Sequence, residues 1–492
     1  MSPDKFKPGP DVWTADLMDY HLEANSSGPP SPAPMSTQDQ TEPKPAATAQ
    51  DDTEPKQPLG PEAAKTPDDN SKAPEAAAAF EYPNVTAPFS LGELITLATP
   101  TMVPHHAPGA AHTRHTFFVD VYLAEHDKIG TMYVESLEPT YKFHPVPIVF
   151  IHDDWHTGQV WITKPDGAPG IASYLLQQGF HVYIVDLPSY GRSPVFATHQ
   201  ALARGNPLSA EMVEERLTAP GRRVRPAWKT AHLHSQWPGV CAQPETPILG
   251  QPIDHEVCNP PLQTGLRDDA AFEAHYGSMA VPALTKFKRQ LLAQSALASL
   301  VDKIGRVALI GHGSGATMAW LAADARPSLI AAIVALEPSG PPFAAYTPNR
   351  LRPSPLERKY GLADAPLTFD PPLASSPAAA SDFALDVELR RATGSRRVCM
   401  LQSGDAPRQL VHLAKMNHAV FTAEASMHSQ YDWTTVEFMK QAGLTVFHFA
   451  LGDLGVYGNG HLMMLEENSD VIAQLVGTWV TLNVRQEWPR AA

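Results

Sequence analysis

The stretch Arg306–Ala316 constrains the fold of this chain more than any other. It begins with the run Arg306-Val307-Ala308-Leu309-Ile310, which has the length and apolar composition of a buried strand. The chain then passes through Gly311-His312-Gly313-Ser314-Gly315 into 316–325, an alanine-rich segment typical of a helix. A buried strand that turns sharply into a helix is the repeating unit of a parallel α/β sheet.

Further strands and helices alternate on both sides of this stretch. The predicted strands are 117–123, 131–137, 147–152, 181–186, 306–310, 330–336, 419–422 and 444–450, and the predicted helices are 171–178, 316–325, 434–442 and 470–482. The first two strands are close enough to pair as a hairpin, whereas 147–152 and 330–336 are apolar, as in strands buried on both faces. We therefore expect an α/β fold with a mostly parallel, doubly wound sheet and helices on both faces.

Two segments interrupt the alternation and set the predicted domain boundaries. Residues 1–84 are rich in Pro, Ala, Ser and Asp. Such a segment cannot bury enough apolar surface to offset the entropy of ordering, so we expect a disordered acidic tail. Residues 196–295 carry many prolines and little periodicity, which predicts a cap inserted between the core segments 85–195 and 296–485.

Charge, hydropathy and cysteine usage narrow the class of function. The formal net charge is −15, and residues 1–80 contribute −8 of it through 14 acidic and 6 basic residues. This balance argues against nucleic-acid binding, and no apolar run reaches the about 18 residues that span a membrane. The N-terminus lacks an apolar signal region, so we expect a cytoplasmic protein. The three cysteines lack CxxC spacing and so predict neither a zinc site nor a disulfide framework. We expect the partner to be a small-molecule substrate. The oligomeric state stays open.

Several motifs, taken in this order, resemble one family. They are His152-x-x-x-x-Thr157-Gly158, Val185-Asp186-x-Pro188-x-x-Gly191-Arg192, His234-Ser235-Gln236-Trp237, Leu336-Glu337-Pro338 and Gly458-Asn459-Gly460-His461. With the glycine turn at 311–315, they make residues 89–485 resemble the α/β-hydrolase superfamily. The narrower resemblance is to bacterial and fungal esterases in which the acid of the catalytic triad follows the strand after the nucleophile turn.

The resemblance implies a triad in the chain order nucleophile, acid, histidine. The acid falls on Glu337 and the histidine on His461, while the nucleophile position falls on Gly313, where the family has serine. The oxyanion loop also differs, because Asp153 and then Asp154 follow His152 where the family usually has glycine. A carboxylate at that place opposes a developing negative charge unless its side chain points away.

Ser314, one residue after the expected nucleophile, has two interpretations. If the turn slips by one residue, Ser314 Oγ is the nucleophile, His461 removes its proton and Glu337 orients His461. If Gly313 holds the strained turn position, the Ser314 hydroxyl instead caps the helix or forms a polar wall. The candidate site therefore comprises the catalytic residues Ser314, Glu337 and His461, with the oxyanion loop and pocket formed by His152, Asp153, Asp154, Trp155 and Gly313.

Two function classes follow from this site. One is an esterase-like hydrolase of a small, mostly apolar ester or lactone that uses Ser314, Glu337 and His461. The other is a member without serine hydrolase activity, either an isomerase, lyase or cyclase that transfers protons through His461 and Glu337, or a ligand-binding protein. Neither His428 nor His461 stands in an HxH or HExxH motif, so the sequence predicts neither a metal nor a cofactor.

Overall fold

The fold is described from a computed structural model of the chain. The described residues are 110–123, 127–195, 208–222, 226, 228–238, 265–267, 269–347, 350–353, 357–373, 384–390 and 399–484. The predicted tail at 1–84 lies outside the described residues, as do Cys241 and Cys258. The third cysteine, Cys399, is a buried free thiol.

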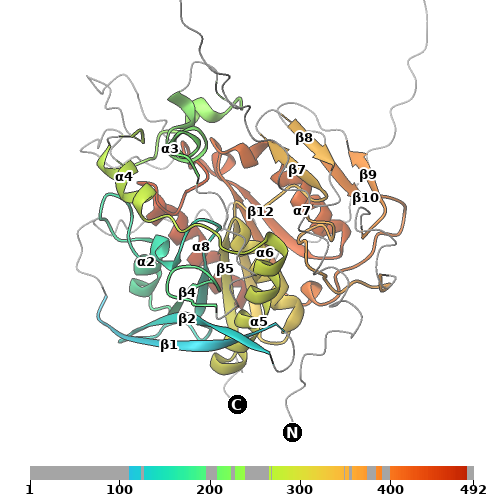
Figure 1. Cartoon of the computed structure of the whole chain (residues 1–492), viewed down its shortest axis with the longest axis horizontal. Helices are drawn as coiled ribbons and strands as arrows, with labels where there is room; N and C mark the ends of the chain where they lie inside the picture. Colours follow the sequence, from blue (N-terminus) through green and yellow to red (C-terminus); the bar gives the residue numbers. More distant parts are fainter. Residues whose placement is uncertain are drawn as a thin grey trace, which may run out of the picture. The chain divides into compact units, whose positions relative to one another are not determined.

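An eight-stranded sheet forms the centre of the fold, in the order β1-β2-β4-β3-β5-β6-β11-β12. Its strands are β1 (His112–Tyr122), β2 (Lys128–Pro139), β3 (Ile148–Ile151), β4 (Val182–Asp186), β5 (Val307–His312), β6 (Ile330–Leu336), β11 (Asn417–Thr422) and β12 (Thr445–Ala450). The β1–β2 hairpin and the β2–β4 pair are antiparallel, and all pairs from β4 to β12 are parallel. The predicted hairpin and the predicted mostly parallel sheet are both confirmed (Figure 1).

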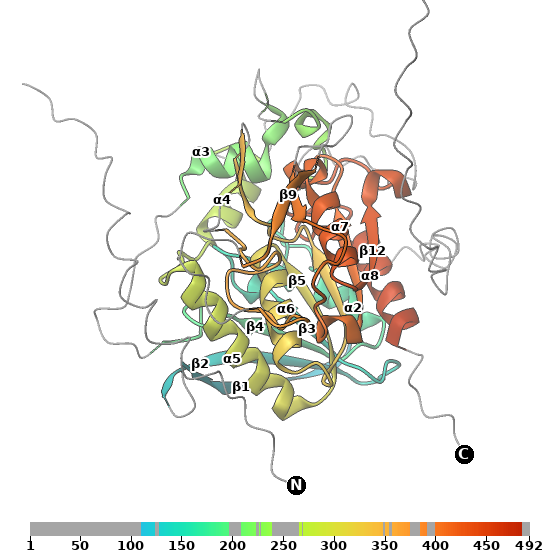
Figure 2. The ribbon, with the colours of Figure 1, turned by 90° about the vertical axis from the view of Figure 1, so that its right-hand side faces the viewer.

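Helices cover both faces of the sheet, because successive side chains of the buried strands point to opposite sides. In β3, Val149 and Ile151 join the apolar cluster that includes α5 (Lys286–Ile304) and α6 (Ser314–Ala325). Ile148 and Phe150 join the cluster that includes α2 (Ile171–Gln177) and α8 (Ser469–Val484). Helix α7 (Asp432–Gln441) packs in the first cluster, and α5 crosses the β1–β2 hairpin and packs against β1 (Figure 2).

Smaller elements lie between these core segments. They are α3 (Ala210–Val213), the π-helix η3 (Glu214–Thr218) and α4 (Ala270–Gly277), the 3₁₀ helices η2 (Gly158–Trp161), η4 (Pro220–Arg222), η5 (Ala231–Leu233), η7 (Leu413–Lys415), η8 (Met427–Gln430) and η9 (Leu451–Leu454), and the pairs β7 (Ala344–Thr347) with β8 (Arg350–Pro353) and β9 (Val387–Arg390) with β10 (Cys399–Gln402). Helix α5 begins within the range predicted for the cap and packs against α6 and β1. The division into tail, cap and core stays a prediction.

No helix of the described part of the chain is both long and apolar enough to cross a bilayer.

Candidate active site

The candidate residues gather at the carboxyl ends of neighbouring strands. Asp153 follows β3, Gly313 follows β5 and Glu337 follows β6, and these three strands are adjacent in the sheet. His461 lies in the loop between η9 and α8. Ligand sites of open α/β sheets lie at this edge, so the sheet order alone brings together residues that are more than 300 positions apart in the sequence.

Gly313 occupies the turn between β5 and α6. Its backbone angles are φ 54° and ψ −119°, which a residue with a side chain adopts only under strain. The flanking glycines serve packing: a Cβ on Gly311 or on Gly315 would lie within 3.0 Å of backbone atoms of the turn or of β3. Strand β5 ends at His312 and helix α6 begins at Ser314, so Gly313 holds the position that the resemblance assigns to the nucleophile.

The carboxylate of Asp153 fills the space beside Gly313 where a nucleophile side chain would stand. A Cβ added to Gly313 would lie within 3.0 Å of Asp153 Cγ and of both carboxylate oxygens. Asp153 Oδ1 accepts hydrogen bonds from the backbone N–H of Ser314 at 2.6 Å and from its neighbour Asp154 at 2.7 Å. These are the two N–H groups that would form an oxyanion hole in this fold, so the protein's own carboxylate engages them.

The Ser314 hydroxyl faces the start of its helix and the loop after β3. Its Oγ accepts a hydrogen bond from the backbone N–H of Asp154 at 3.0 Å. The group nearest to the reactive nitrogen of His461 is instead Asp153, whose Oδ2 lies 3.4 Å from Nε2. The structure therefore pairs His461 with Asp153 on the side where the family pairs the histidine with serine.

On its other side, His461 meets the predicted acid. Its Nδ1 lies 3.3 Å from Glu337 Oε2, and the Glu337 side chain is fully buried. The carboxylate of Glu337 also accepts hydrogen bonds from the backbone N–H of Ala423, at 2.6 Å, and from the Ser426 hydroxyl. Glu337 has φ 47°, an uncommon angle for a residue with a side chain, as often found where function requires strain.

The charges of the site are strongly coupled. Burial acts to lower the pKa of His461, but hydrogen bonds to Asp153 and Glu337 outweigh it and raise that pKa to about 10. Burial acts to raise the pKa of Asp153, but the hydrogen bond to His461 and the positive charge of its ring hold it well below its usual value. At neutral pH His461 is thus an imidazolium that faces an ionised Asp153.

A second layer of histidines surrounds this group. The His428 ring stacks on the His461 ring at 4.8 Å, and its Nδ1 lies 3.1 Å from Asp432 Oδ1. His312 Nε2 donates to the backbone carbonyl of His461 at 2.9 Å. Burial lowers the pKa of His312 well below its usual value and that of His428 to about 4. The sequence assigned no role to His312; its place just before Gly313 was the available signal.

The remaining predicted pocket residues fix the loop after β3. His152 is buried; its Nε2 accepts from the backbone N–H of Leu187 and its Nδ1 donates to the carbonyl of Asp153. Asp154 accepts from the Tyr190 hydroxyl at 2.7 Å and forms an ion pair with Arg289 at 2.7 Å, so its carboxylate is held by groups outside the triad. Trp155 has φ 62°, and its carbonyl accepts from the N–H of Ala280.

Two sets of residues have the composition of a metal site. One set is Asp153, His312 and His461, and the other is Glu337, His428 and His461.

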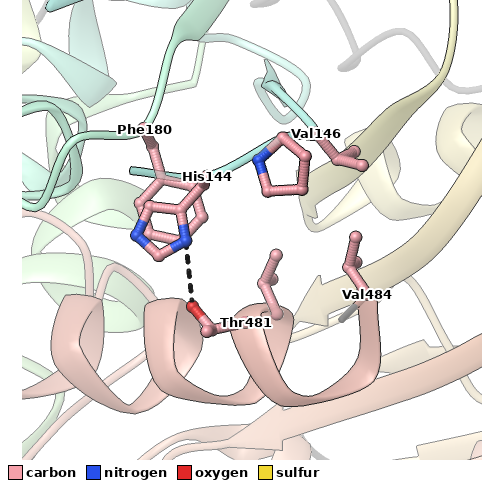
Figure 3. A pocket seen from close by; sticks show the side chains of 7 residues that line it. His144, Val146, Phe180, Thr481 and Val484 are labelled. Carbon is pink, nitrogen blue, oxygen red and sulfur yellow. Dashed lines mark hydrogen bonds between the residues drawn. The ribbon is translucent and has the colours of Figure 1, made fainter. Parts of the chain in front are cut away.

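A pocket lies at the opposite edge of the sheet, away from the candidate site (Figure 3). It lies where the chain enters β3 and where α8 ends, and His144, Phe180, Thr481 and Val484 contribute to its lining. None of the predicted site residues lines it.

Comparison with known proteins identifies the family. The model of the alpha/beta hydrolase family matches residues 148–475, which include all three strands that carry the site. The chain belongs to the alpha/beta hydrolase family. Among curated proteins it is similar to "Probable secreted lipase phiG" of Fungal sp. (strain ATCC 74256), with 33% identity over 71% of this chain and 85% of that protein.

Two esterases are among the solved structures to which the chain is similar. A bacterial esterase determined at atomic resolution matches 78% of this chain and 99% of its own length, with 17% identity and a TM-score of 0.45. A thermophilic esterase from Thermogutta terrifontis matches 75% of this chain and 99% of its own length, with 12% identity and a TM-score of 0.32.

Proposed function

We propose that this protein hydrolyses a small, mostly apolar ester or lactone without forming a serine acyl-enzyme. The observation that carries the proposal is the Asp153 carboxylate, which fills the space of the absent nucleophile at Gly313 and faces His461 at 3.4 Å. In this proposal Asp153, His461 and Glu337 are the working groups, and water attacks the substrate. Ser314 is not a nucleophile in this proposal; its backbone N–H donates a hydrogen bond to Asp153, and the residue begins helix α6.

The substrate class rests on two supports. The chain belongs to a hydrolase family, and the curated relative at 33% identity carries the name of a lipase. The retained pair of His461 and a fully buried Glu337 adds a chemical reason, because an acid–histidine pair is costly to bury where it serves no reaction.

The direction of the Ser314 hydroxyl is the reason that we propose attack by water rather than by Ser314. Its Oγ accepts from the backbone N–H of Asp154, while His461 Nε2 faces Asp153. Attack on the ester develops a negative charge on the carbonyl oxygen, which the N–H groups of Asp154 and Ser314 would bind in this fold. Asp153 Oδ1 already accepts from both of them. We therefore assign the polarisation of the substrate carbonyl to His461, whose Nε2 lies 3.4 Å from Asp153 Oδ2.

The test is hydrolysis of short-chain p-nitrophenyl esters and aliphatic lactones by the full chain. Ser314→Ala should keep the turnover of the parent, whereas Asp153→Asn and His461→Gln should each lose about 100-fold or more, as removal of an acid–base group does. A fluorophosphonate probe should not label the parent. Labelling of Ser314, together with loss of turnover in Ser314→Ala, would overturn the proposal.

A second candidate function is proton transfer without hydrolysis, as in an isomerase, lyase or cyclase. It is favoured by the same hydrogen bonds, because a site whose oxyanion donors are occupied is poorly suited to acyl transfer. No ester in the panel would then be hydrolysed. Deuterium from solvent would instead exchange into the carbon next to a carbonyl of a ketone probe, and His461→Gln would abolish this exchange. A ligand-binding protein would show neither reaction.

We also propose that the protein is located in the cytoplasm. The sequence favours the cytoplasm, whereas the curated relative is named a secreted lipase. Fractionation of the source cells, with detection of the full chain in cell lysate and in medium, separates these two locations.

A further inference from the structure

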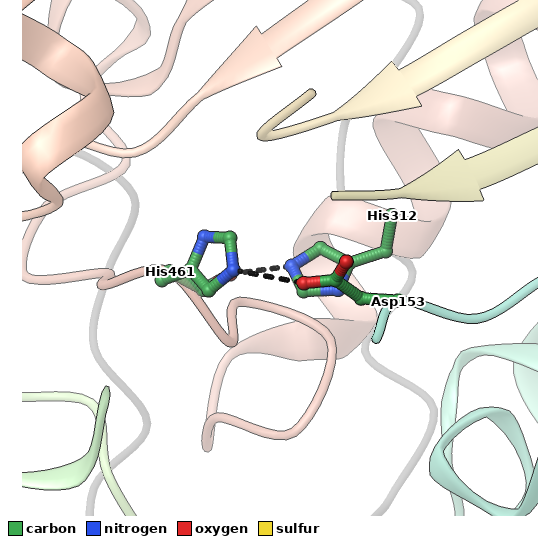
Figure 4. A group of neighbouring side chains, drawn as sticks. All are labelled: Asp153, His312 and His461. Atoms are coloured by element: carbon green, nitrogen blue, oxygen red, sulfur yellow. Dashed lines mark hydrogen bonds and ion pairs between the residues drawn. The ribbon is translucent and has the colours of Figure 1, made fainter. Parts of the chain in front are cut away.

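Three donor side chains converge beside the glycine turn. One donor atom each of Asp153, His312 and His461 lies within 4.8 Å of the other two. Figure 4 shows the His312 ring and the Asp153 carboxylate on the side that the His461 ring faces. The three residues come from different segments, namely the loop after β3, the end of β5 and the loop before α8.

Each of these side chains has one polar atom that a neighbouring group already holds and a second that this group does not hold. His312 Nε2 donates to the carbonyl of His461, and its Nδ1 is buried with no partner among the described residues. His461 Nδ1 is held by Glu337, which leaves Nε2 facing Asp153. Asp153 Oδ1 accepts from two backbone N–H groups, which leaves Oδ2.

This pattern is the one that metal-binding histidines show. Such a histidine nearly always donates its second ring N–H to a carboxylate or to a backbone carbonyl, which fixes the ring and its tautomer. Here Glu337 plays that part for His461, and the His461 carbonyl plays it for His312.

The spacing agrees with a metal as well. Two ligand atoms of a tetrahedral zinc site, each bonded at about 2.0–2.1 Å, lie about 3.3 Å apart. His461 Nε2 and Asp153 Oδ2 lie 3.4 Å apart, which is long for a charge-assisted hydrogen bond. The third ligand atom, on His312, lies within 4.8 Å of these two.

We propose that Asp153, His312 and His461 bind a divalent transition-metal ion, with Zn²⁺ as the preferred ion, beside Gly313, and that the ion displaces the proton from His461 Nε2. Two imidazoles and one carboxylate are ligands that suit Zn²⁺, and three protein ligands leave one position open, as in catalytic rather than structural zinc sites. The proposal deepens the proposed function and rests on it for the substrate, since a bound ion can polarise an ester carbonyl or a water molecule.

The glycine at 313 fits this proposal. A side chain at that position would occupy the space of the Asp153 carboxylate and so displace one ligand. Both departures from the family pattern, glycine at 313 and aspartate at 153, then have one cause.

The second set of residues is a weaker candidate. Glu337 accepts from Ala423, Ser426 and His461, and His428 Nδ1 lies 3.1 Å from Asp432. Because these donor atoms already have partners, an ion there would have to break several buried hydrogen bonds.

The test is metal binding by the full chain after dialysis against a chelator. Titration with Zn²⁺ by calorimetry should show one ion per chain, and Co²⁺ should give the visible d–d absorption of a site of low coordination number. Asp153→Asn and His312→Phe should each weaken binding by about 100-fold or more, while the exposed-site control His232→Gln and the variant His428→Phe should bind as the parent does.

A second variant tests the proposal if these substitutions prevent folding. Gly313→Ser keeps all three ligands but crowds the Asp153 carboxylate, so it should lose Co²⁺ absorption with a parent-like circular dichroism spectrum. The parent binding no ion would overturn the metal site, as would loss of binding in His428→Phe with retention in His312→Phe.

Failure of the metal site and failure of the proposed function give different results. If esters are hydrolysed at the same rate in chelator, and Asp153→Asn still abolishes turnover, the proposed function stands without the metal. If Zn²⁺ binds at these residues but no ester or lactone is hydrolysed, the metal site stands and the substrate class is wrong.

Discussion

At the scale of single residues, Gly313 and Asp153 share one volume, and only one of them can carry a side chain into it. Gly313→Ser alone should therefore remain unreactive toward a fluorophosphonate, because Asp153 still fills the space and holds both N–H groups. The double variant Gly313→Ser with Asp153→Gly removes the carboxylate, frees the two N–H groups and places a hydroxyl next to His461. It should be labelled, and mass spectrometry of the labelled peptide is the measurement.

The double variant with His461→Gln added serves as the control, since a serine without its base should react far more slowly. Labelling of Gly313→Ser as fast as the double variant would show that Asp153 does not block the turn. It would also weaken the proposal that this carboxylate replaces the nucleophile.

At the scale of elements, helix α5 holds the loop that carries Asp153. Arg289 of α5 pairs with Asp154 at 2.7 Å, and the two side chains are only 11% and 12% exposed. Arg289→Met leaves a buried carboxylate without its cation, so we expect the free energy of unfolding to fall by about 3 kcal/mol. Urea unfolding of both proteins at one pH measures the difference.

A matched pair elsewhere provides the comparison. Arg326 pairs with Asp302 at 2.8 Å, but these side chains are 21% and 47% exposed. Arg326→Met should therefore cost less than about 1 kcal/mol. Equal losses in the two variants would mean that the Arg289 pair does not anchor the loop through burial.

At the scale of the whole molecule, the core contains neutral histidines that oppose acid. His418 of β11 is 1% exposed, and burial lowers its pKa to about 4. The His418 side chain of the unfolded chain takes up a proton near pH 6.5, whereas that of the folded chain stays neutral until about pH 4. The contribution of His418 to the free energy of unfolding is therefore fully present above pH 6.5 and is lost as the pH falls toward 4. This one residue accounts for roughly 3 kcal/mol of that loss.

Urea unfolding at pH 7 and pH 4.5 measures this effect. His418→Gln should have a smaller difference in stability between the two pH values than the parent, even if it is less stable at pH 7. The exposed-site variant His232→Gln should keep the full difference. A parent whose stability does not change over this range would contradict the neutral buried state of His418.

The sequence by itself determined the sheet, the hairpin and the order of the core elements along the chain. Apolar runs and glycine turns are local signals, and a strand that is buried on both faces leaves the same mark wherever it stands in the sheet. The resemblance to the α/β-hydrolases, rather than these local signals, implied Gly313 at the nucleophile position and Glu337 and His461 as the acid and the histidine.

What fills that position was decided only by the tertiary structure. Asp153 and Gly313 are 160 positions apart, and they meet because β3 and β5 are neighbours in the sheet. The direction of one carboxylate, toward the turn rather than toward solvent, depends on two backbone N–H groups, and one of them belongs to the distant Ser314. No local pattern encodes such a contact, because it exists only after the strands have paired.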